Sequence, residues 1–149
     1  TGLYGPRQLG GEDHGWVANF AIRTLLGQPL NIYGTGKQVR DILYATDLCE
    51  AFDAFYKERK PGIYNIGGGM ETSISLLECI EILKKITGIK PQVNFCSERK
   101  GDLRYFVCDT SKAKRYLNWK AKTLPEEGIA NLVNWIRENM RLFKGGQAV

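Results

Sequence analysis

The 149-residue sequence contains a single histidine, His14, and only four cysteines. A Ser-His-Asp or Cys-His catalytic site would have to use that one histidine, and a metal site would be short of nitrogen ligands. The cysteines, which are Cys49, Cys79, Cys96 and Cys108, form no C-x-x-C pair and therefore no zinc-binding pattern. We predict no metal site, read His14 as a loop residue without a catalytic role, and interpret the cysteines as reduced core thiols of a cytoplasmic protein.

Long apolar runs are also missing. No run approaches the roughly 20 residues that a membrane-spanning helix needs, and the first residues show no basic-then-apolar signal segment. The sequence starts at Thr1 inside a Gly-rich stretch, which we interpret as a start within a longer protein. Apolar residues make up 43% and charged residues 25%, the balance of one folded globular domain and not of a disordered or fibrous chain.

Positive charge is in modest excess, with 21 Lys and Arg against 16 Asp and Glu. The basic pairs Arg59-Lys60, Lys84-Lys85 and Arg99-Lys100 allow a nucleic-acid-binding role as an alternative. However, they are scattered, and Lys84-Lys85 fits the solvent-facing side of an amphipathic helix. We therefore expect neither nucleic acid nor a membrane as the partner.

Helical and strand patterns alternate along the sequence, which favours an α/β fold. The patterns predict helices over 15–26, 46–58, 75–86 and 111–117 and from Pro125 onward, and strands over 30–33, 40–44, 62–66, 93–96 and 103–108. Residues 1–14, rich in glycine and proline, read as a loop. We expect Thr46 as a helix N-cap and capping boxes at Ser75/Glu78 and Thr123/Glu126.

Three segments place arginine or asparagine beside glycine: YGTGKQVRD at 33–41, YNIGGG at 64–69 and RKGD at 99–102. Glycine lets a ligand approach the backbone closely, and the planar arginine fork matches phosphate oxygens. Asn65 lies where a predicted strand opens into a triple-glycine turn, so its amide could reach a ligand there. Each segment alone is more often an ordinary turn or a solvated surface, so the interpretation depends on their combination.

In this order the segments resemble a known family. The strings LNIYGTGKQVRDILYATDLCEAF, YNIGGG, ERKGDLRYFVCDTSKAKRYLNWKAK and GIANLVNWIREN are similar to the C-terminal portion of NAD-dependent nucleotide-sugar epimerases and dehydratases, which are extended short-chain dehydrogenases/reductases. The segment YGPRQLGGEDHGWV resembles CDP-paratose (CDP-tyvelose) 2-epimerases, with His14 where that segment has glutamine. The fold implied for residues 1–149 is the α/β, C-terminal substrate-binding part of a Rossmann-type enzyme, without the N-terminal dinucleotide-binding half.

The resemblance implies a pocket for a nucleotide-diphosphate sugar, with a CDP-linked sugar as the expected ligand. Arg40 would contact the diphosphate, Arg99 would lie at the phosphate-ribose end, and Asp102 would accept a ribose hydroxyl. Asn31 and Tyr33 would hold the base. Gly15 and Trp16 would begin a helix that lines the nucleotide, and Asn65 would lie near the nucleotide. Tyr4, Gly5 and Pro6 would lie in the loop that passes the sugar and the nicotinamide, and they are the implied cofactor-binding residues.

By the same resemblance, the complete enzyme would oxidise a sugar hydroxyl with bound NAD, at C2 in the 2-epimerases. The keto intermediate would turn, and hydride would return to its other face. No G-x-G-x-x-G or G-x-x-G-x-x-G occurs here, so NAD would be bound mainly by the N-terminal half. Three Tyr-x-x-x-Lys matches lack a long helix that would fix the spacing; we therefore predict no catalytic residue and no turnover by this chain alone. The matches are Tyr33/Lys37, Tyr56/Lys60 and Tyr116/Lys120.

The resemblance also implies how the chain associates. Residues 41–66 would pack toward the dinucleotide domain, so that its absence would expose Leu43, Leu48 and Phe52. We therefore expect a homo-oligomer, such as a dimer. Two alternatives stay open: another family branch, such as a dTDP-glucose 4,6-dehydratase or a UDP-sugar 4-epimerase, and a stand-alone, non-catalytic nucleotide-binding module.

Overall fold

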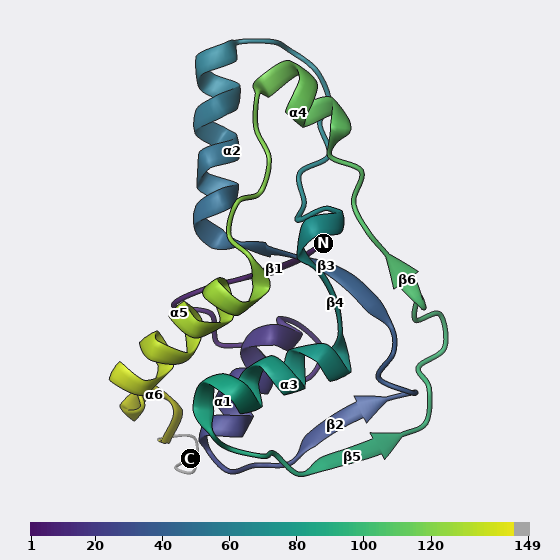
Figure 1. The fold of residues 1–149 in the computed structure, drawn as a ribbon, viewed down its shortest axis with the longest axis vertical. Coiled ribbons are helices and arrows are strands. Elements are labelled where there is room, and N and C mark those ends of the chain that lie inside the picture. Colours follow the sequence, from purple (N-terminus) through teal and green to yellow (C-terminus); the bar gives the residue numbers. More distant parts are fainter. Residues whose placement is uncertain (145–149) are drawn as a thin grey trace.

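Helices and strands alternate along the chain in the computed structural model, which describes residues 1–144 (Figure 1). This confirms the α/β class. The strands are β1 (Gly2–Tyr4), β2 (Leu30–Tyr33), β3 (Val39–Tyr44), β4 (Ser73–Ser75), β5 (Val93–Cys96) and β6 (Tyr105–Phe106). The helices are α1 (Trp16–Leu25), α2 (Ala45–Glu58), α3 (Leu76–Thr87), α4 (Ser111–Leu117), α5 (Pro125–Glu138) and α6 (Arg141–Lys144), with a 3₁₀ turn at Met70–Thr72. None of these helices is long and apolar enough to cross a membrane.

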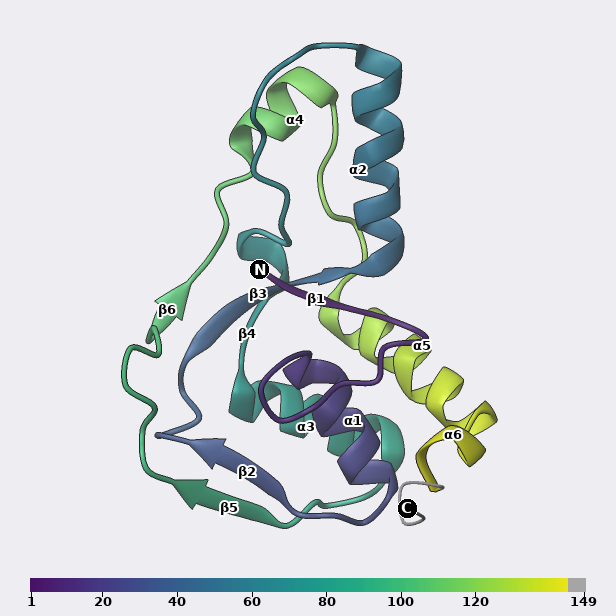
Figure 2. The same cartoon turned by 180° about the vertical axis from the view of Figure 1, so that it is seen from behind.

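Strand β3 is the centre of the larger sheet. Its C-terminal half pairs in parallel with β1, from Gly2↔Ile42 to Tyr4↔Tyr44. Its N-terminal half pairs with β4 on one side, antiparallel, and with β6 in parallel. Strands β2 and β5 form a separate parallel pair, seen from behind along the lower edge of the molecule (Figure 2). The residue segments around 33, 40 and 99 are thereby brought to one side of the molecule.

Two apolar cores lie on either side of the sheet's centre. The larger joins α1, α3 and α5 around buried residues such as Leu30, Ile42 and Leu83. The smaller surrounds Leu43, with residues from α2, α4 and the segment that includes Trp119. Figure 1 shows α2 and α4 as an arm that extends away from the three-helix body.

The helix starts test the expected caps. At α3 the predicted capping box is present: Glu78 N–H donates to Ser75 Oγ at 3.2 Å, and Ser75 N–H donates to Glu78 Oε2 at 2.7 Å. The second expected box, Thr123/Glu126, is wrong. Thr123 instead donates its N–H to Asp47 Oδ2 at 3.0 Å and its hydroxyl to Asp47 Oδ1 at 3.2 Å, because the buried Asp47 carboxylate lies closer. Thr46 is not a cap either, since α2 begins at Ala45 after Tyr44, with no side-chain cap.

Two strand predictions need correction. Residues 62–66 form no strand, because Ile63 and Asn65 are exposed and the segment connects α2 to the glycine turn without a pairing partner. The predicted strand over 103–108 is reduced to Tyr105–Phe106. Conversely, β1 and β4 were not expected, since each has only three residues and depends on pairing with β3.

The side chains expected to become exposed behave differently from one another. Phe52 is 67% exposed, whereas Leu48 is partly buried and packs against the smaller core. Leu43, by contrast, is 1% exposed, so that expectation is wrong: its side chain is the centre of the smaller core.

Cys79 is a buried core thiol, whereas Cys49 lies on the exposed side of α2, so the interpretation of all four cysteines as core residues is wrong for Cys49.

Candidate functional site

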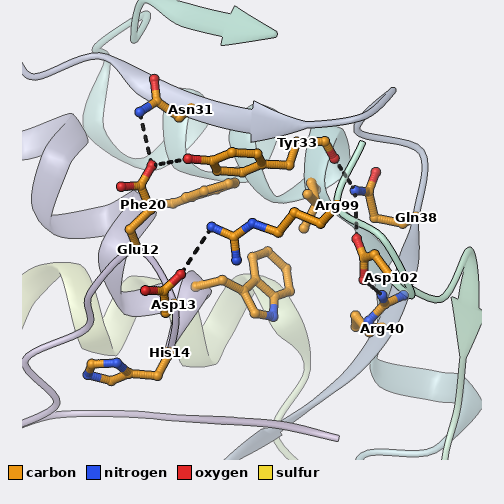
Figure 3. A pocket seen from close by; sticks show the side chains of 13 residues that line it. Glu12, Asp13, His14, Phe20, Asn31, Tyr33, Gln38, Arg40, Arg99 and Asp102 are labelled. Atoms are coloured by element: carbon orange, nitrogen blue, oxygen red, sulfur yellow. Dashed lines mark hydrogen bonds and ion pairs between the residues drawn. The ribbon is translucent and has the colours of Figure 1, made fainter. Parts of the chain in front are cut away.

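A pocket of about 220 Å³ lies where β2, β3 and the start of α1 meet the loop that carries Arg99 and Asp102 (Figure 3). Its apolar lining comes from Trp16, Phe20 and Leu76. The ring of Trp16 contacts that of Phe20 edge-to-face, with centroids 5.6 Å apart. Polar side chains from four separate segments surround these rings, so the pocket combines stacking surfaces with charge.

Arg40 reaches the pocket because side chains alternate between the two faces along β3. Its Nη2 pairs with Asp102 Oδ1 at 2.5 Å, and its Nη1 donates to the Val39 carbonyl at 2.8 Å. Asp102 also accepts Gln38 Nε2 at 3.3 Å. The neighbouring Asp41 points to the opposite, fully buried side. Arg40 is thus held at the pocket wall by a carboxylate that was expected to bind a ribose hydroxyl.

Arg99 crosses the pocket from the opposite loop. Its guanidinium lies over the Tyr33 ring, 4.0 Å from the ring centroid, and Nη2 pairs with Asp13 Oδ1 at 3.2 Å. Stacking on an aromatic face orients the guanidinium plane. The pair with Asp13 is exposed to solvent, since the Asp13 side chain is 86% accessible, and exposed pairs contribute little to stability. An incoming anion can therefore replace Asp13 at small cost.

A hydrogen-bonded cluster closes one end of the pocket. Glu12 Oε1 accepts Asn31 Nδ2 at 3.0 Å and the Tyr33 hydroxyl at 2.8 Å. The bond from Asn31, followed by that from Tyr33, lowers the pKa of the Glu12 carboxyl, and the same carboxylate raises the pKa of Tyr33. The cluster therefore holds an ionised carboxylate next to two side chains that can donate hydrogen bonds.

The start of α1 also faces the pocket. Gly15 precedes the helix with φ 66°, in the left-handed region that favours glycine, and a Cβ there would press on Gln8. The first turn of α1 carries no acidic residue and no side-chain cap. Its backbone N–H groups and the positive end of the helix dipole are suited to an anion.

The structure brings most of the expected site residues together. The residues that line this one pocket are Gly15, Trp16, Asn31, Tyr33, Arg40, Arg99 and Asp102. Asn65 lies elsewhere, where its amide donates to the Asp109 carbonyl at 3.5 Å. The Tyr4 ring is buried in the larger core, so of the cofactor-binding residues Tyr4, Gly5 and Pro6 only Pro6 is exposed. What these residues bind stays a prediction.

Sequence reasoning missed several pocket residues, chiefly Glu12, Asp13, Phe20 and Gln38. Glu12 and Asp13 lie in a glycine-bounded loop, and that acidic pair between glycines was the available signal. His14 also lines the pocket, although we predicted no catalytic role for it. Phe20 lies within the helix predicted over 15–26, and nothing in its spacing separates a pocket residue from a core residue.

The Gly67–Gly69 turn does not present its backbone to a dinucleotide phosphate. The Gly67–Gly69 turn is the nearest counterpart of a phosphate-binding turn, but its N–H groups point inward: Gly68 and Gly69 donate to Asp41 Oδ2 at 2.9 and 3.3 Å. Lys60 and Lys120, from two of the Tyr-x-x-x-Lys matches, pair with Glu58 and Glu71. Among residues 1–144 there is also no group of three or more His, Cys, Asp or Glu side chains placed to hold a metal ion.

Sequence comparison assigns the class. Residues 3–132 match the profile of the family described as GDP-mannose 4,6 dehydratase, which spans most of the chain. The chain belongs to this family of NAD-dependent nucleotide-sugar epimerases and dehydratases, the extended short-chain dehydrogenases/reductases. Its relatives include dehydratases and a decarboxylase besides epimerases.

Individual relatives show how much is shared. The chain is 38% identical to a UDP-glucuronate 4-epimerase of Thermodesulfobacterium geofontis over 78% of its length, and 32% identical to a CDP-paratose 2-epimerase of Salmonella typhi over 91%. The crystal structure of a UDP-glucose 4-epimerase of Thermotoga maritima with UDP-glucose superposes with a TM-score of 0.82, at 34% identity over 93% of the chain. The chain spans 36%, 42% and 44% of these proteins, which is less than half of each. Other family structures hold UDP-sugars together with NAD.

Proposed function

We propose that this chain is the nucleotide-diphosphate-sugar-binding portion of an NAD-dependent sugar epimerase that acts on a CDP-linked sugar at C2, as CDP-paratose 2-epimerase does. NAD would be held mainly by residues outside this chain, and the whole enzyme would act in the cytoplasm. The alternatives remain a 4,6-dehydratase or UDP-sugar 4-epimerase branch of the same family, or a non-catalytic nucleotide-binding module.

The observation that carries the proposal is that Arg40 and Arg99 line the same pocket. The two residues are far apart in the sequence, and they come from β3 and a separate loop. A diphosphate carries several oxygens that accept the planar arginine fork, and such charge-assisted bonds are stronger than neutral ones. Trp16, Phe20 and the Tyr33 ring supply the aromatic surface on which a base can lie.

The size of the pocket fits a part of the ligand. Sites for small molecules usually enclose roughly 300–1,000 Å³, whereas this pocket measures about 220 Å³ and opens to solvent. It suits the nucleoside diphosphate end, while the sugar would extend beyond it. The choice of CDP and of C2 chemistry is supported by the likeness of residues 4–17 to the 2-epimerases and by the relative from Salmonella typhi.

Calorimetric titration with CDP tests the proposal. We expect Arg40→Ala and Arg99→Ala each to weaken binding at least tenfold, because a hydrogen bond to a charged group contributes about 1.5–3 kcal/mol and 1.4 kcal/mol is a factor of ten. Arg137→Ala removes an exposed arginine of α5 that is not part of the pocket and serves as the control. Wild-type affinity in both pocket variants would contradict the assignment.

The chain alone is expected to give no turnover. Incubation with NAD and a CDP-sugar, followed by chromatographic separation of epimers, should show substrate only, because NAD would be held mainly by residues outside this chain. Robust formation of an epimer by the 149-residue chain would refute this part of the proposal.

A further inference from the structure

The end of the pocket farthest from Arg40 presents a specific arrangement of donors and acceptors. Glu12 lies there with Asn31 and Tyr33, and the aromatic ring of Phe20 is beside them (Figure 3). Both hydrogen bonds of Glu12 go to Oε1, and within residues 1–144 Oε2 accepts none. A nucleotide whose diphosphate contacts Arg40 would extend past Arg99, whose guanidinium lies over the Tyr33 ring, and would place the edge of its base against this cluster.

The cluster offers one acceptor and two donors. A glutamate side chain is ionised at neutral pH, and the hydrogen bonds from Asn31 and Tyr33 lower the pKa of Glu12 further, so its carboxylate can only accept. Asn31 Nδ2 and the Tyr33 hydroxyl donate, and each can turn from Glu12 to a ligand atom.

Pyrimidine bases differ at the atom that would meet this carboxylate. Cytosine carries an amino group at position 4, which donates to a carboxylate, and acceptors at N3 and O2. Uracil carries a carbonyl oxygen at position 4, so two acceptors would face each other without a proton between them. Two acceptors that face each other repel and form no hydrogen bond, so this contact disfavours uracil.

We propose that Glu12 selects the base of the bound nucleotide, accepting the 4-amino group of cytosine and disfavouring the 4-oxo group of uracil. This inference rests on the proposed function, since it needs a nucleoside diphosphate whose phosphates lie at Arg40 and Arg99. Guanine also offers N–H donors to a carboxylate, but cytosine matches the full set of one acceptor and two donors. We therefore commit to cytosine and include guanine in the test.

The test is calorimetric titration of the 149-residue chain with CDP, UDP and GDP. The wild-type chain should bind CDP at least tenfold more tightly than UDP, and more tightly than GDP. Glu12→Gln keeps the shape but adds an amide donor that can meet the uracil carbonyl, so the CDP preference over UDP should fall at least tenfold. Asp13→Asn makes the same change of charge at the next residue, which contacts Arg99, and should change both affinities by the same factor.

The outcomes separate the two proposals. An unchanged CDP:UDP ratio in Glu12→Gln, or a wild-type chain that prefers UDP or GDP, overturns the role of Glu12. In that case a loss of binding in Arg40→Ala and Arg99→Ala would still support the proposed function. If no nucleoside diphosphate binds the wild-type chain, both proposals fail. Because the Glu12 side chain is exposed, the variant should keep the wild-type circular dichroism spectrum and melting temperature, which verifies that it is folded.

Discussion

Gly68 is held in place by contacts on two sides. Its N–H donates to the buried Asp41 carboxylate at 2.9 Å, while Thr72 donates its hydroxyl to the Ile42 carbonyl at 2.7 Å. A Cβ on Gly68 would overlap both the Thr72 hydroxyl and the Ile42 carbonyl. The glycine is therefore required by close packing of the turn against β3, the strand that carries Arg40.

Gly68→Ala should destabilise the fold by about 1–3 kcal/mol or more, because overpacking against backbone cannot be relieved by a rotamer change. Denaturant unfolding followed by circular dichroism measures the loss. Gly62→Ala is the matched control, since its new Cβ would approach only the ring of Tyr64, at 3.3 Å in an exposed connection. Equal midpoints for the two variants would show that the turn relaxes without cost.

For individual residues, the sequence predicted which side chains line the pocket better than it predicted which side chains they pair with. Arg40 and Arg99 share a pocket, as the pattern of arginine beside glycine and the family resemblance led us to expect. Asn65 does not join them, because a strand that would have aimed its amide does not form. The pairing of Asp102 with Arg40 was not predictable, since it depends on how two loops meet, and no local spacing encodes that contact.

Identical capping patterns give different results in two helices. Ser75-x-x-Glu78 closes on itself at α3, whereas Thr123-x-x-Glu126 does not, because Asp47 from α2 takes both polar groups of Thr123. Local propensity thus decides a helix start only where no buried group competes. The same limit explains β1 and β4, whose short sequences become strands only through pairing with residues about 40 and 35 positions away.

Glu78→Ala should lower stability at pH 7 by roughly 0.5–1 kcal/mol, since the N-terminus of α3 loses its capping carboxylate. Hydrogen bonds from the Ser75 backbone and hydroxyl lower the pKa of Glu78 below its ordinary 4.5. A lowered pKa in the folded state stabilises the fold fully above the unfolded pKa, and this contribution is lost as the pH falls through the folded value. The gap between wild type and variant should therefore be largest above about pH 4.5 and shrink in more acidic buffer.

Urea midpoints measured from pH 3 to pH 7 provide the check. Glu126→Ala is the control, because it has the same place in the sequence pattern but no capping box. A gap for Glu78→Ala that stays constant with pH, or a loss as large in Glu126→Ala, would argue against the capping role.

The molecule as a whole leaves one helix only half covered. The inner side of α2 packs on the smaller core, but the outer side exposes Phe52 by 67% and Tyr56 by 68%. Large exposed aromatic groups on one helix face are typical of an interaction surface. We expect this face to pack on the dinucleotide domain in a complete enzyme, as the family resemblance implies for residues 41–66.

Without such a domain, the 149-residue chain should associate with itself through the same face. Sedimentation velocity between about 5 and 200 µM should show a larger species whose fraction rises with protein concentration. The double variant Phe52→Glu/Tyr56→Glu should be monomeric, because burying charges without partners opposes association. Phe95→Glu removes a similarly exposed aromatic ring, 62% accessible on β5, and should leave the association unchanged. If the α2 variant associates as strongly as wild type, or if Phe95→Glu alone abolishes the larger species, then copies meet through another surface. In that case the aromatic side of α2 takes no part in self-association, although Phe52 and Tyr56 are exposed in the single chain.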